Sequence, residues 1–221
     1  MTDELQMNGP RMIDWLRTRR SVRTFANKPI ERAVLERLIE AATTAPSSSN
    51  RQPWKWSVVT SKATRDAIVE AIGKRATEIK EIIARGHHAE DYGSYGDFFY
   101  EPLRDAAAIV VPQYRPYPDL IANLIASGGG DPAKYTTAGA MQAELVSTSA
   151  AIMALLLQAH AEGLGACMMA GPMIAKDQIH ALLGITEPWQ MVGAIALGHL
   201  AMPLPTNTPR KPMDRVVTWH A

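Results

Sequence analysis

Apolar residues recur at helical spacing in two stretches near the N-terminus. In RMIDWLRTRR, Met12, Ile13 and Leu16 predict a helix that ends near Arg20. In KPIERAVLERLIEAAT the apolar positions form one face of an amphipathic helix, and Pro46 marks its end. That face consists of Val34, Leu35, Leu38, Ile39 and Ala42. The chain therefore opens with two helices before any strand.

The central part of the chain alternates strands and helices. WKWSVVT, residues 54–60, is rich in β-branched and aromatic side chains and predicts a strand. A helix is expected from Lys62 to Arg85, with Gly86 as its C-terminal stop. Its apolar stripe consists of Ile68, Ile72, Ala76, Ile79 and Ile83. AAAIVVP, residues 106–112, predicts a short buried strand.

Two segments lack a regular helical or strand pattern. Residues 87–101 carry glycines and aromatic side chains and predict a loop. Residues 113–135 carry prolines and three consecutive glycines, with a short helix expected from Asp119 to Ala126. Irregular segments of this length within a domain are usually functional or mobile.

The C-terminal third predicts the rest of the core. Residues 138–163 are apolar almost all round and predict a helix that is buried on most sides. GLGACMM, residues 163–169, predicts a strand, AKDQIHALLG, residues 175–184, a helix, and QMVGAIALGH, residues 190–199, a last core strand. The Pro-rich tail from residue 200 ends in a strand-like VVTW, and we expect it to pack on a second copy of the chain.

The order of these elements and the composition favour one α+β domain over residues 1–221. Two helices precede the first strand, which argues against a doubly wound sheet. Hydrophobic residues make up 47% and charged residues 20%, an ordinary globular profile. The formal net charge of +1 and the pI of about 7.9 argue against a nucleic-acid partner, which needs a broad basic field.

The cysteine count and the N-terminus lead us to expect a cytoplasmic protein without a membrane partner. Cys167 is the only cysteine, so no internal disulfide can form, which fits a reducing compartment. MTDELQMNGPRMIDWL has no apolar segment typical of a signal peptide, and AAIMALLLQA is too short to span a bilayer. The adjacent His87 and His88 have no second group of ligands, so we expect no metal site.

The cluster RRSVR, residues 19–23, is the first candidate binding motif. Alternate side chains share a face in an extended segment, so Arg19, Ser21 and Arg23 are expected to point the same way. Two guanidinium groups and a hydroxyl on one face suit a phosphate. Taken alone, the stretch is equally typical of a solvated basic turn.

Two further motifs offer polar side chains or a backbone that a ligand can approach closely. APSSSNRQPW, residues 45–54, places hydroxyls and the amides of Asn50 and Gln52 before a strand, which suits the edge of a planar heterocycle or an ordinary capping loop. MMAGP, residues 168–172, follows a strand with a glycine that permits close approach of a ligand, or simply forms a turn. GLGAC precedes its strand and lacks a third glycine, so it is not a Rossmann fingerprint.

The sequence lacks the common motifs for a catalytic nucleophile or a metal site. If the protein is an enzyme, it therefore depends on a bound cofactor. The sequence contains no P-loop, no HExxH and no paired CxxC, and Ser47 to Ser49 lack a nucleophile-elbow pattern. The basic pair Arg210 and Lys211 in the tail either adds charge to the anion site or is simply solvated. A cofactor would then supply the chemistry.

Taken in order, these motifs resemble those of the nitroreductase family of FMN-dependent oxidoreductases. The resemblance rests on RRSVRTF, on APSSSNRQPW, on GLGACMMAGP after a long helix, and on ALGH followed by PRKP. Their order and spacing match from about Ile13 to Val217. The family implies a three-layer α-β-α sandwich with a mixed, mainly antiparallel sheet. It also implies an obligate homodimer with FMN at the interface and a C-terminal extension that wraps the partner.

The resemblance also implies roles for individual residues. Arg19, Arg20, Ser21 and Arg23 are expected to hold the FMN phosphate and ribityl chain, joined by Arg210. The loop that borders the flavin from the other subunit is expected to contain Pro46, Ser47 and Ser48, supported by Asn50 and Gln52. Met169, Ala170 and Gly171 are expected to lie along the flavin ring.

The activity implied is ping-pong transfer of hydride from NAD(P)H through flavin N5 to a small aromatic acceptor, such as a nitroarene or a quinone. No side chain is expected to act as an essential acid or base. The lid of the pocket is expected to come from residues 87–101 and 113–135. Its aromatic side chains are Tyr92, Tyr95, Phe98, Phe99, Tyr114, Tyr117 and Tyr135. The alternatives are a flavin-binding carrier or regulatory module without turnover, a reductase with another electron donor, and a specialised reaction such as dehalogenation, dehydrogenation or flavin fragmentation.

One stretch departs from the family pattern. Many relatives place a polar residue before the second core strand, where it reaches the pyrimidine edge of the flavin. This chain has FFYEPLRDA there, and neither Phe99 nor Pro102 can make such a contact. Arg104 is the candidate substitute.

Overall fold

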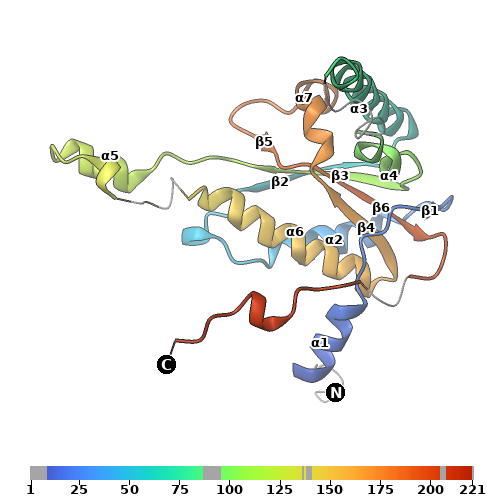
Figure 1. The fold of residues 1–221 in the computed structure, drawn as a ribbon, viewed down its shortest axis with the longest axis horizontal. Coiled ribbons are helices and arrows are strands. Elements are labelled where there is room, and N and C mark those ends of the chain that lie inside the picture. The colour runs from blue at the N-terminus through green and yellow to red at the C-terminus, as the bar shows by residue number, and fades with distance from the viewer. Residues whose placement is uncertain (1–8, 87–95, 136, 138–140, 205–207, 221) are drawn as a thin grey trace.

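A six-stranded sheet forms the middle layer of the computed structural model, which describes residues 9–86, 96–135, 137, 141–204 and 208–220 (Figure 1). The strands are β1 Phe25–Ala26, β2 Trp54–Val59, β3 Ala108–Tyr114, β4 Leu164–Met169, β5 Gln190–Met191 and β6 Ala194–Leu200. β6 is central, because Ala196 lies opposite Ile109 of β3 on one side and opposite Cys167 of β4 on the other. The ladders between these strands are antiparallel. A single parallel bridge joins Ser21 to Ala166.

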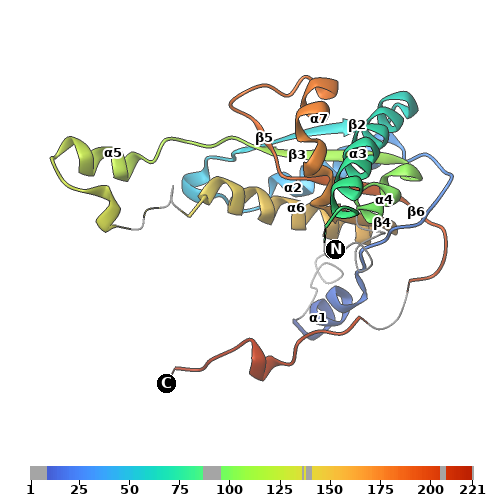
Figure 2. The same ribbon diagram turned by 45° about the horizontal axis from the view of Figure 1, so that its top comes forward.

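Helices cover both faces of the sheet, which confirms the α+β sandwich. They are α1 Gly9–Thr18, α2 Arg32–Thr43, α3 Lys62–Ile83, α4 Glu101–Arg104, α5 Leu120–Ser127, α6 Ala143–Ala161 and α7 Lys176–Leu183. Figures 1 and 2 show α2 and α6 on one face, with α3, α4 and α7 on the other. The predicted helices form, with shifts of a few residues at their ends, and so do the predicted core strands, apart from the corrections given below.

Alternation along the strands supplies both cores. In β3, Ile109 and Val111 pack with α3 and α7, whereas Ala108 and Val110 pack with α2 and α6. Each of these four side chains is at most 1% exposed. Because successive strand residues point to opposite faces, a near-continuous apolar strand fits between two helical layers.

α6 is buried on one side only, so the prediction that it is buried on most sides is wrong for the single chain. Its inner side, with Ala151 and Leu155, is fully buried, while Val146 is 63% and Met153 is 41% exposed. By length and composition alone, it is the one helix among the described residues that could cross a membrane. Its inner side packs on α2 and the sheet, as in the core helix of a globular domain.

Three local predictions need correction. The last core strand is divided into β5 and β6, with Val192 and Gly193 between them. Part of the 87–101 loop is helical, since a 3₁₀ turn covers Asp97–Phe99 and α4 begins at Glu101, while residues 87–95 lie outside the described part. VVTW forms no strand, because it follows the 3₁₀ turn Met213–Arg215 without a neighbouring strand to pair with.

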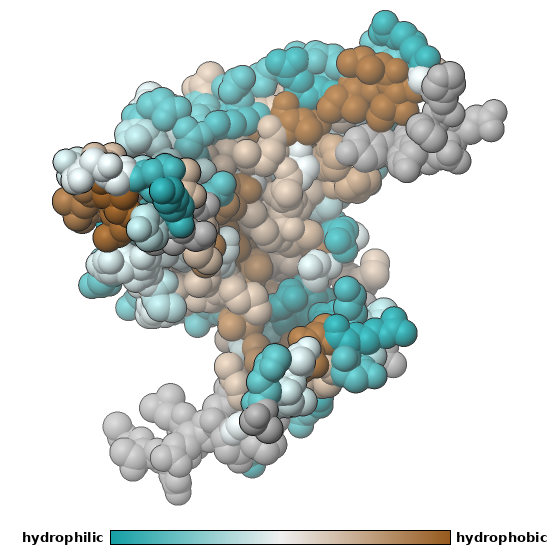
Figure 3. Space-filling model, turned by 60° about the vertical axis from the view of Figure 1, so that its left-hand side comes forward, coloured by the Kyte–Doolittle hydropathy of each residue, from teal (hydrophilic) through white to brown (hydrophobic). Residues whose placement is uncertain are grey.

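Two segments extend away from the sandwich. The arm, defined here as residues 115–135, continues from β3 and carries α5, and the tail leaves β6 and passes beside α1 (Figures 1 and 2). Residues 113 and 114 belong to β3, so the second irregular segment begins at residue 115, two residues later than predicted. The arm exposes large side chains over more than half of their surface: Leu120, Ile121, Leu124 and Tyr135. Figure 3 shows hydrophobic surface on the arm.

Candidate functional site

The arginine cluster lies where the chain crosses the outer edge of β4. α1 ends at Thr18, and Ser21 forms its parallel bridge with Ala166. The N–H of Val22 donates to the carbonyl of Ala166 over 3.0 Å. The segment after α1 is therefore extended, as predicted. Arg19 is half-buried and Arg23 is exposed along this edge.

Two paired glycines allow this segment to lie against the sheet. Gly165 of β4 and Gly198 of β6 are register partners. A Cβ atom on Gly165 would lie 2.7 Å from a methyl carbon of Val22, and one on Gly198 would lie 2.7 Å from the Phe25 ring. Real Cβ atoms do not approach so closely, so glycine is required at both positions for the chain to pack here. The pair fixes the segment that carries Arg19 and Arg23.

The two outer arginines of the cluster carry uncompensated charge. Among the described residues, no acidic side chain pairs with Arg19 or Arg23. Burial raises the pKa of the Cys167 thiol, and the guanidinium groups of Arg23 and Arg19 act in the opposite direction. The nearby His160 has a pKa below its usual value, first because of burial and then because of Arg19 and Arg20. This edge of β4 is therefore a positive site.

Arg20 behaves differently from its neighbours. Its guanidinium group turns back and donates to the carbonyl of Arg19 over 2.8 Å and to that of Arg17. It closes the C-terminal end of α1, where carbonyl groups lack helical partners. All three arginines were predicted to have the same role, whereas in the structure Arg20 also makes a helix-capping contact.

The turn after β4 is the second predicted flavin contact. Met169 is buried, Ala170 is exposed and Gly171 is half-buried. A Cβ atom on Gly171 would lie 2.3 Å from the Phe99 ring, so the ring rests directly on this glycine. Since strands rise about 3.3 Å per residue, the turn lies roughly 10 Å along β4 from Ala166, where Ser21 is bound. Both motifs thus lie at one edge of the sheet.

The serine loop, residues 46–52, has an unusual backbone. Ser49, Asn50 and Gln52 have φ angles of 53°, 51° and 47°, in the left-handed region that non-glycine residues rarely occupy. The Ser47 hydroxyl accepts a hydrogen bond from the N–H of Gln52 over 2.9 Å. The amide of Gln52 donates to Oδ1 of Asn50 over 3.2 Å. Strained backbone of this kind is held by surrounding structure and often occurs at functional sites.

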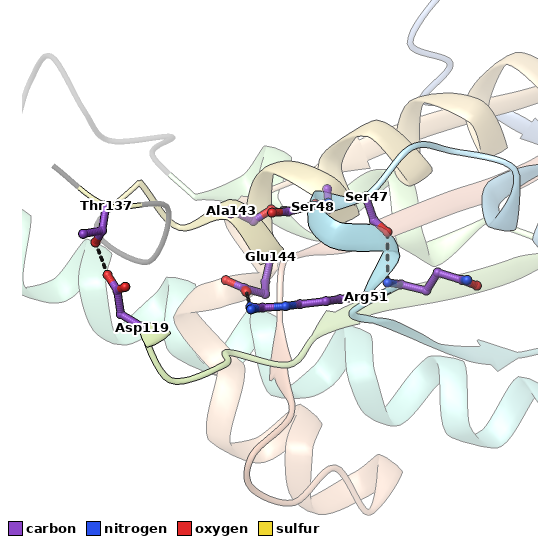
Figure 4. A network of polar contacts seen from close by, with 9 residues as sticks. Ser47, Ser48, Arg51, Asp119, Thr137, Ala143 and Glu144 are labelled. Atoms are coloured by element: carbon purple, nitrogen blue, oxygen red, sulfur yellow. Dashed lines mark hydrogen bonds and ion pairs between the residues drawn. The ribbon is translucent and has the colours of Figure 1, made fainter. Parts of the chain in front are cut away.

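The N-terminus of α6 holds the serine loop (Figure 4). The N–H of Ser48 donates to the Ser147 hydroxyl over 3.1 Å, and that hydroxyl donates to the carbonyl of Ala143. Arg51 Nη1 pairs with Glu144 Oε1 at 2.9 Å. Glu144 is buried although it is charged, and the sequence analysis did not single out either partner.

One chain does not bring all the predicted contacts together. The serine loop is fixed at the Ser147 end of α6, and the arginine cluster lies near His160 at the other end. At 1.5 Å per residue, these two points on α6 lie roughly 20 Å apart. The structure therefore places the Arg19–Arg23 cluster and the Met169–Gly171 turn on the same strand, β4, and separates the arginine cluster from the serine loop. The remaining predicted phosphate contact, Arg210, is exposed in the tail and donates to the carbonyl of Pro209.

The predicted lid side chains have different surroundings. Phe98 is 55% exposed and lies edge-on to the partly buried Phe99, with centroids 4.6 Å apart. Tyr114 ends β3, and Tyr135 is exposed on the arm. Tyr92 and Tyr95 lie outside the described residues.

Tyr117 is not an open stacking surface. The guanidinium carbon of Arg51 lies over its ring at 5.1 Å from the centroid, and that of Arg115 at 5.2 Å. A cavity of about 200 Å³ is lined by this ring, the start of α5, Glu144 and the serine loop. Residues 51–54 and 114–118 lie close together because Trp54 of β2 pairs with Tyr114 of β3. Sequence analysis could have found this contact only by predicting that strand pairing.

Arg104 lies over the Tyr100 ring, 5.6 Å from its centroid, and lines a cavity of about 570 Å³ together with Lys28 and Arg65. The Met169–Gly171 turn does not line that cavity. A contact between Arg104 and a flavin stays a prediction. Among the described residues, no group of acidic, histidine and cysteine side chains forms a metal site.

The family model that describes the nitroreductase family matches residues 16–199. This chain belongs to the nitroreductase family. It is 28% identical to an NADH dehydrogenase from Thermus thermophilus over 91% of this chain and 92% of that protein. It is also 28% identical to a 4-nitrobenzoate reductase from Nocardioides sp., over 92% and 87% of the two chains. The fold matches a BluB-like flavoprotein from Clostridium difficile 630 with a TM-score of 0.83, 22% identity and coverage of 95% and 99%. The family assignment and the fold predicted from the motifs are thus confirmed.

Proposed function

We propose that the protein is an FMN-dependent oxidoreductase that passes hydride from NAD(P)H to a small aromatic acceptor of the nitroarene or quinone class. The observation that carries this proposal is the positive edge of β4. Arg19 and Arg23 have no acidic partner among the described residues, and they lie on the same edge as the Met169–Gly171 turn. A compact pair of uncompensated guanidinium groups suits the single terminal phosphate of FMN.

The residues of this chain have separable tasks in that proposal. Arg19, Arg23 and the hydroxyl of Ser21 bind the phosphate, and the turn from Met169 to Gly171 lines the ring. Bound FMN supplies the hydride-transfer chemistry. The protein then positions the donor and the acceptor and excludes water, and no side-chain acid or base is required.

The distance between the motifs supports a homodimer. Because the serine loop lies roughly 20 Å along α6 from the arginine cluster, we infer that a second copy supplies Pro46, Ser47 and Ser48 to the flavin. The exposed apolar side chains of α6, the arm and the tail support this arrangement, since a second copy would cover them. Val146 and Met153 represent the α6 surface, and Trp219, 85% exposed, represents the tail.

The relatives guide the choice of donor and acceptor. One is named an NADH dehydrogenase and another a 4-nitrobenzoate reductase, which supports nicotinamide as donor and a nitroarene as acceptor. A cytoplasmic location remains our expectation from the single cysteine.

Anaerobic reduction tests the proposal. Purified protein loaded with FMN is mixed with NADH or NADPH, and absorbance near 450 nm is followed, before addition of a panel of nitroarenes, quinones and halophenols. We expect rapid bleaching by at least one nicotinamide and reoxidation by at least one acceptor. Bound flavin that neither nicotinamide reduces would indicate a carrier or another electron donor, and a chain that binds no FMN would overturn the proposal.

A further inference from the structure

Arg51 joins three parts of the chain that are far apart in sequence. It belongs to the serine loop and pairs with Glu144 at the N-terminus of α6 over 2.9 Å. Its guanidinium group also lies over the ring of Tyr117, at the base of the arm. The Glu144 side chain is only 7% exposed, whereas that of Arg51 is 33% exposed, so the carboxylate is buried and its partner reaches it from the surface.

The arm has few other anchors at this end. The N–H of Arg115 donates to the carbonyl of Pro53 over 2.8 Å, which ties the start of the arm to the end of the serine loop. Asp119 caps α5 by accepting from the N–H of Ala122 over 3.1 Å, and it also accepts a hydrogen bond from the Thr137 hydroxyl. The Asp119 contacts order the α5 end of the arm, the Arg115–Pro53 bond fixes its backbone where it leaves β3, and the Arg51–Tyr117 contact is the side-chain contact that holds it against the serine loop.

We propose that Arg51 is a positioning residue that fixes the arm against the serine loop and thereby sets how tightly the acceptor is held. This proposal rests on the proposed function, because the serine loop borders the flavin and the arm belongs to the predicted lid. Arginine suits the task because its planar group can pair with a carboxylate and lie over an aromatic ring at once. Lysine can keep the charge pair but has no planar group to place over Tyr117.

The chain offers a matched control at the other end of α6. Arg37 of α2 donates to both carboxylate oxygens of Glu162 over 2.7 and 2.8 Å. Like Arg51, it joins another element to an end of α6, but no aromatic ring and no part of the arm or serine loop contacts it among the interactions described. Arg37→Lys therefore changes an arginine–glutamate pair on the same helix without changing the arm.

The first measurement is hydrogen exchange of the α5 amides in the full-length chain without added cofactor. Arg51→Lys and Tyr117→Leu, which both keep the positive partner of buried Glu144, are each expected to speed exchange several-fold. The double variant is expected to match Tyr117→Leu alone, because loss of the ring already removes the Arg51 contact together with that of Arg115. Arg37→Lys should leave α5 unchanged. Equal exchange in Arg51→Lys and Arg37→Lys, or additive effects in the double variant, would overturn the proposal.

The second measurement is steady-state reduction of a nitroarene by the FMN-loaded variants. Arg51→Lys is expected to raise the acceptor KM about tenfold while kcat changes less than about threefold, with FMN content unchanged. An unchanged KM beside altered α5 exchange would refute the link to acceptor binding. If the wild-type chain binds no FMN, the proposed function fails, and hydrogen exchange still decides whether Arg51 holds the arm.

Discussion

The Thr18 hydroxyl oxygen and Nε2 of His160 lie 2.7 Å apart, which joins the last residue of α1 to the C-terminal end of α6. The Thr18 hydroxyl donates its hydrogen to the carbonyl of Trp15, so its oxygen accepts from His160. The centroid of the His160 imidazole ring also lies 5.2 Å from the centroid of the Trp15 ring. His160 is therefore fixed beside the arginine cluster and reports on its charge.

The titration of His160 should respond to a bound phosphate. Burial, Arg19 and Arg20 lower the pKa of His160 below its ordinary value of 6.5. FMN should raise that pKa, because its phosphate offsets the positive field. NMR titration of the ring protons with and without FMN checks this. His180 is the control, since its pKa is also lowered mainly by burial but Lys176 is its main charged neighbour. A shift shared equally by both histidines would contradict a phosphate beside His160.

The same depressed pKa predicts a pH dependence of stability. The unfolded chain binds a proton at His160 at higher pH than the folded chain does, so the contribution is present above about pH 6.5 and is lost as the pH falls below it. Urea unfolding at pH 7.5 and 5.5 should show a smaller loss of stability for His160→Gln than for the wild-type chain. An identical loss in both would show that His160 titrates normally.

Replacing Arg19 and Arg23 together with alanine should remove FMN from the purified protein. Hydrogen bonds to charged groups contribute about 1.5–3 kcal/mol each, so the dissociation constant should rise by roughly a hundredfold or more. Flavin absorbance of the purified protein and titration with added FMN measure this. Arg17→Ala is the control, because Arg17 is exposed on the adjoining helix and pairs with Asp14. A double variant that keeps full flavin would exclude this phosphate site.

The sequence predicts the sandwich because its periodicities are strong and local. The stripe on α3 and the apolar run of β3 need no knowledge of the partner elements, and their burial agrees with the pattern. β1 escaped prediction because two residues, Phe25 and Ala26, show no periodicity, and only their pairing with β6 defines them as a strand. Short strands depend on neighbours that lie far away in sequence.

The candidate site divides in the same way. Arg19 and Arg23 could be singled out because like charges gather in one short stretch. The role of Gly165 and Gly198 could not, since their pairing across two strands becomes visible only in the sheet register. Arg51 and Glu144 are separated by 93 residues, and each alone resembles an ordinary surface charge. Tyr117 was predicted as a lid residue, but the two guanidinium groups over its ring follow from tertiary packing alone.

Gly171→Ala should disturb the turn that is expected to line the flavin. The new Cβ atom would lie 2.3 Å from the Phe99 ring, which must move. Overpacking of this kind costs about 1–3 kcal/mol. Urea unfolding should show this loss, and the visible circular dichroism of bound flavin should change. Adding Phe99→Leu should recover part of both. Gly73→Ala is the control, because its Cβ atom would have only an ordinary contact at 3.9 Å with Tyr100.

We expect that one negative charge introduced on the exposed apolar face of α6 will prevent dimerisation. Val146 is 63% exposed in the chain alone, so Val146→Glu costs little in a monomer but buries an unpaired carboxylate if a second copy packs there. We expect the wild-type chain to be dimeric by light scattering and the variant to be monomeric with weaker FMN binding, since in the proposed dimer each flavin contacts the other copy's serine loop. Leu182→Glu on α7, where the leucine is 44% exposed, should leave both properties unchanged. A Val146→Glu protein that stays dimeric and yellow would place the interface elsewhere.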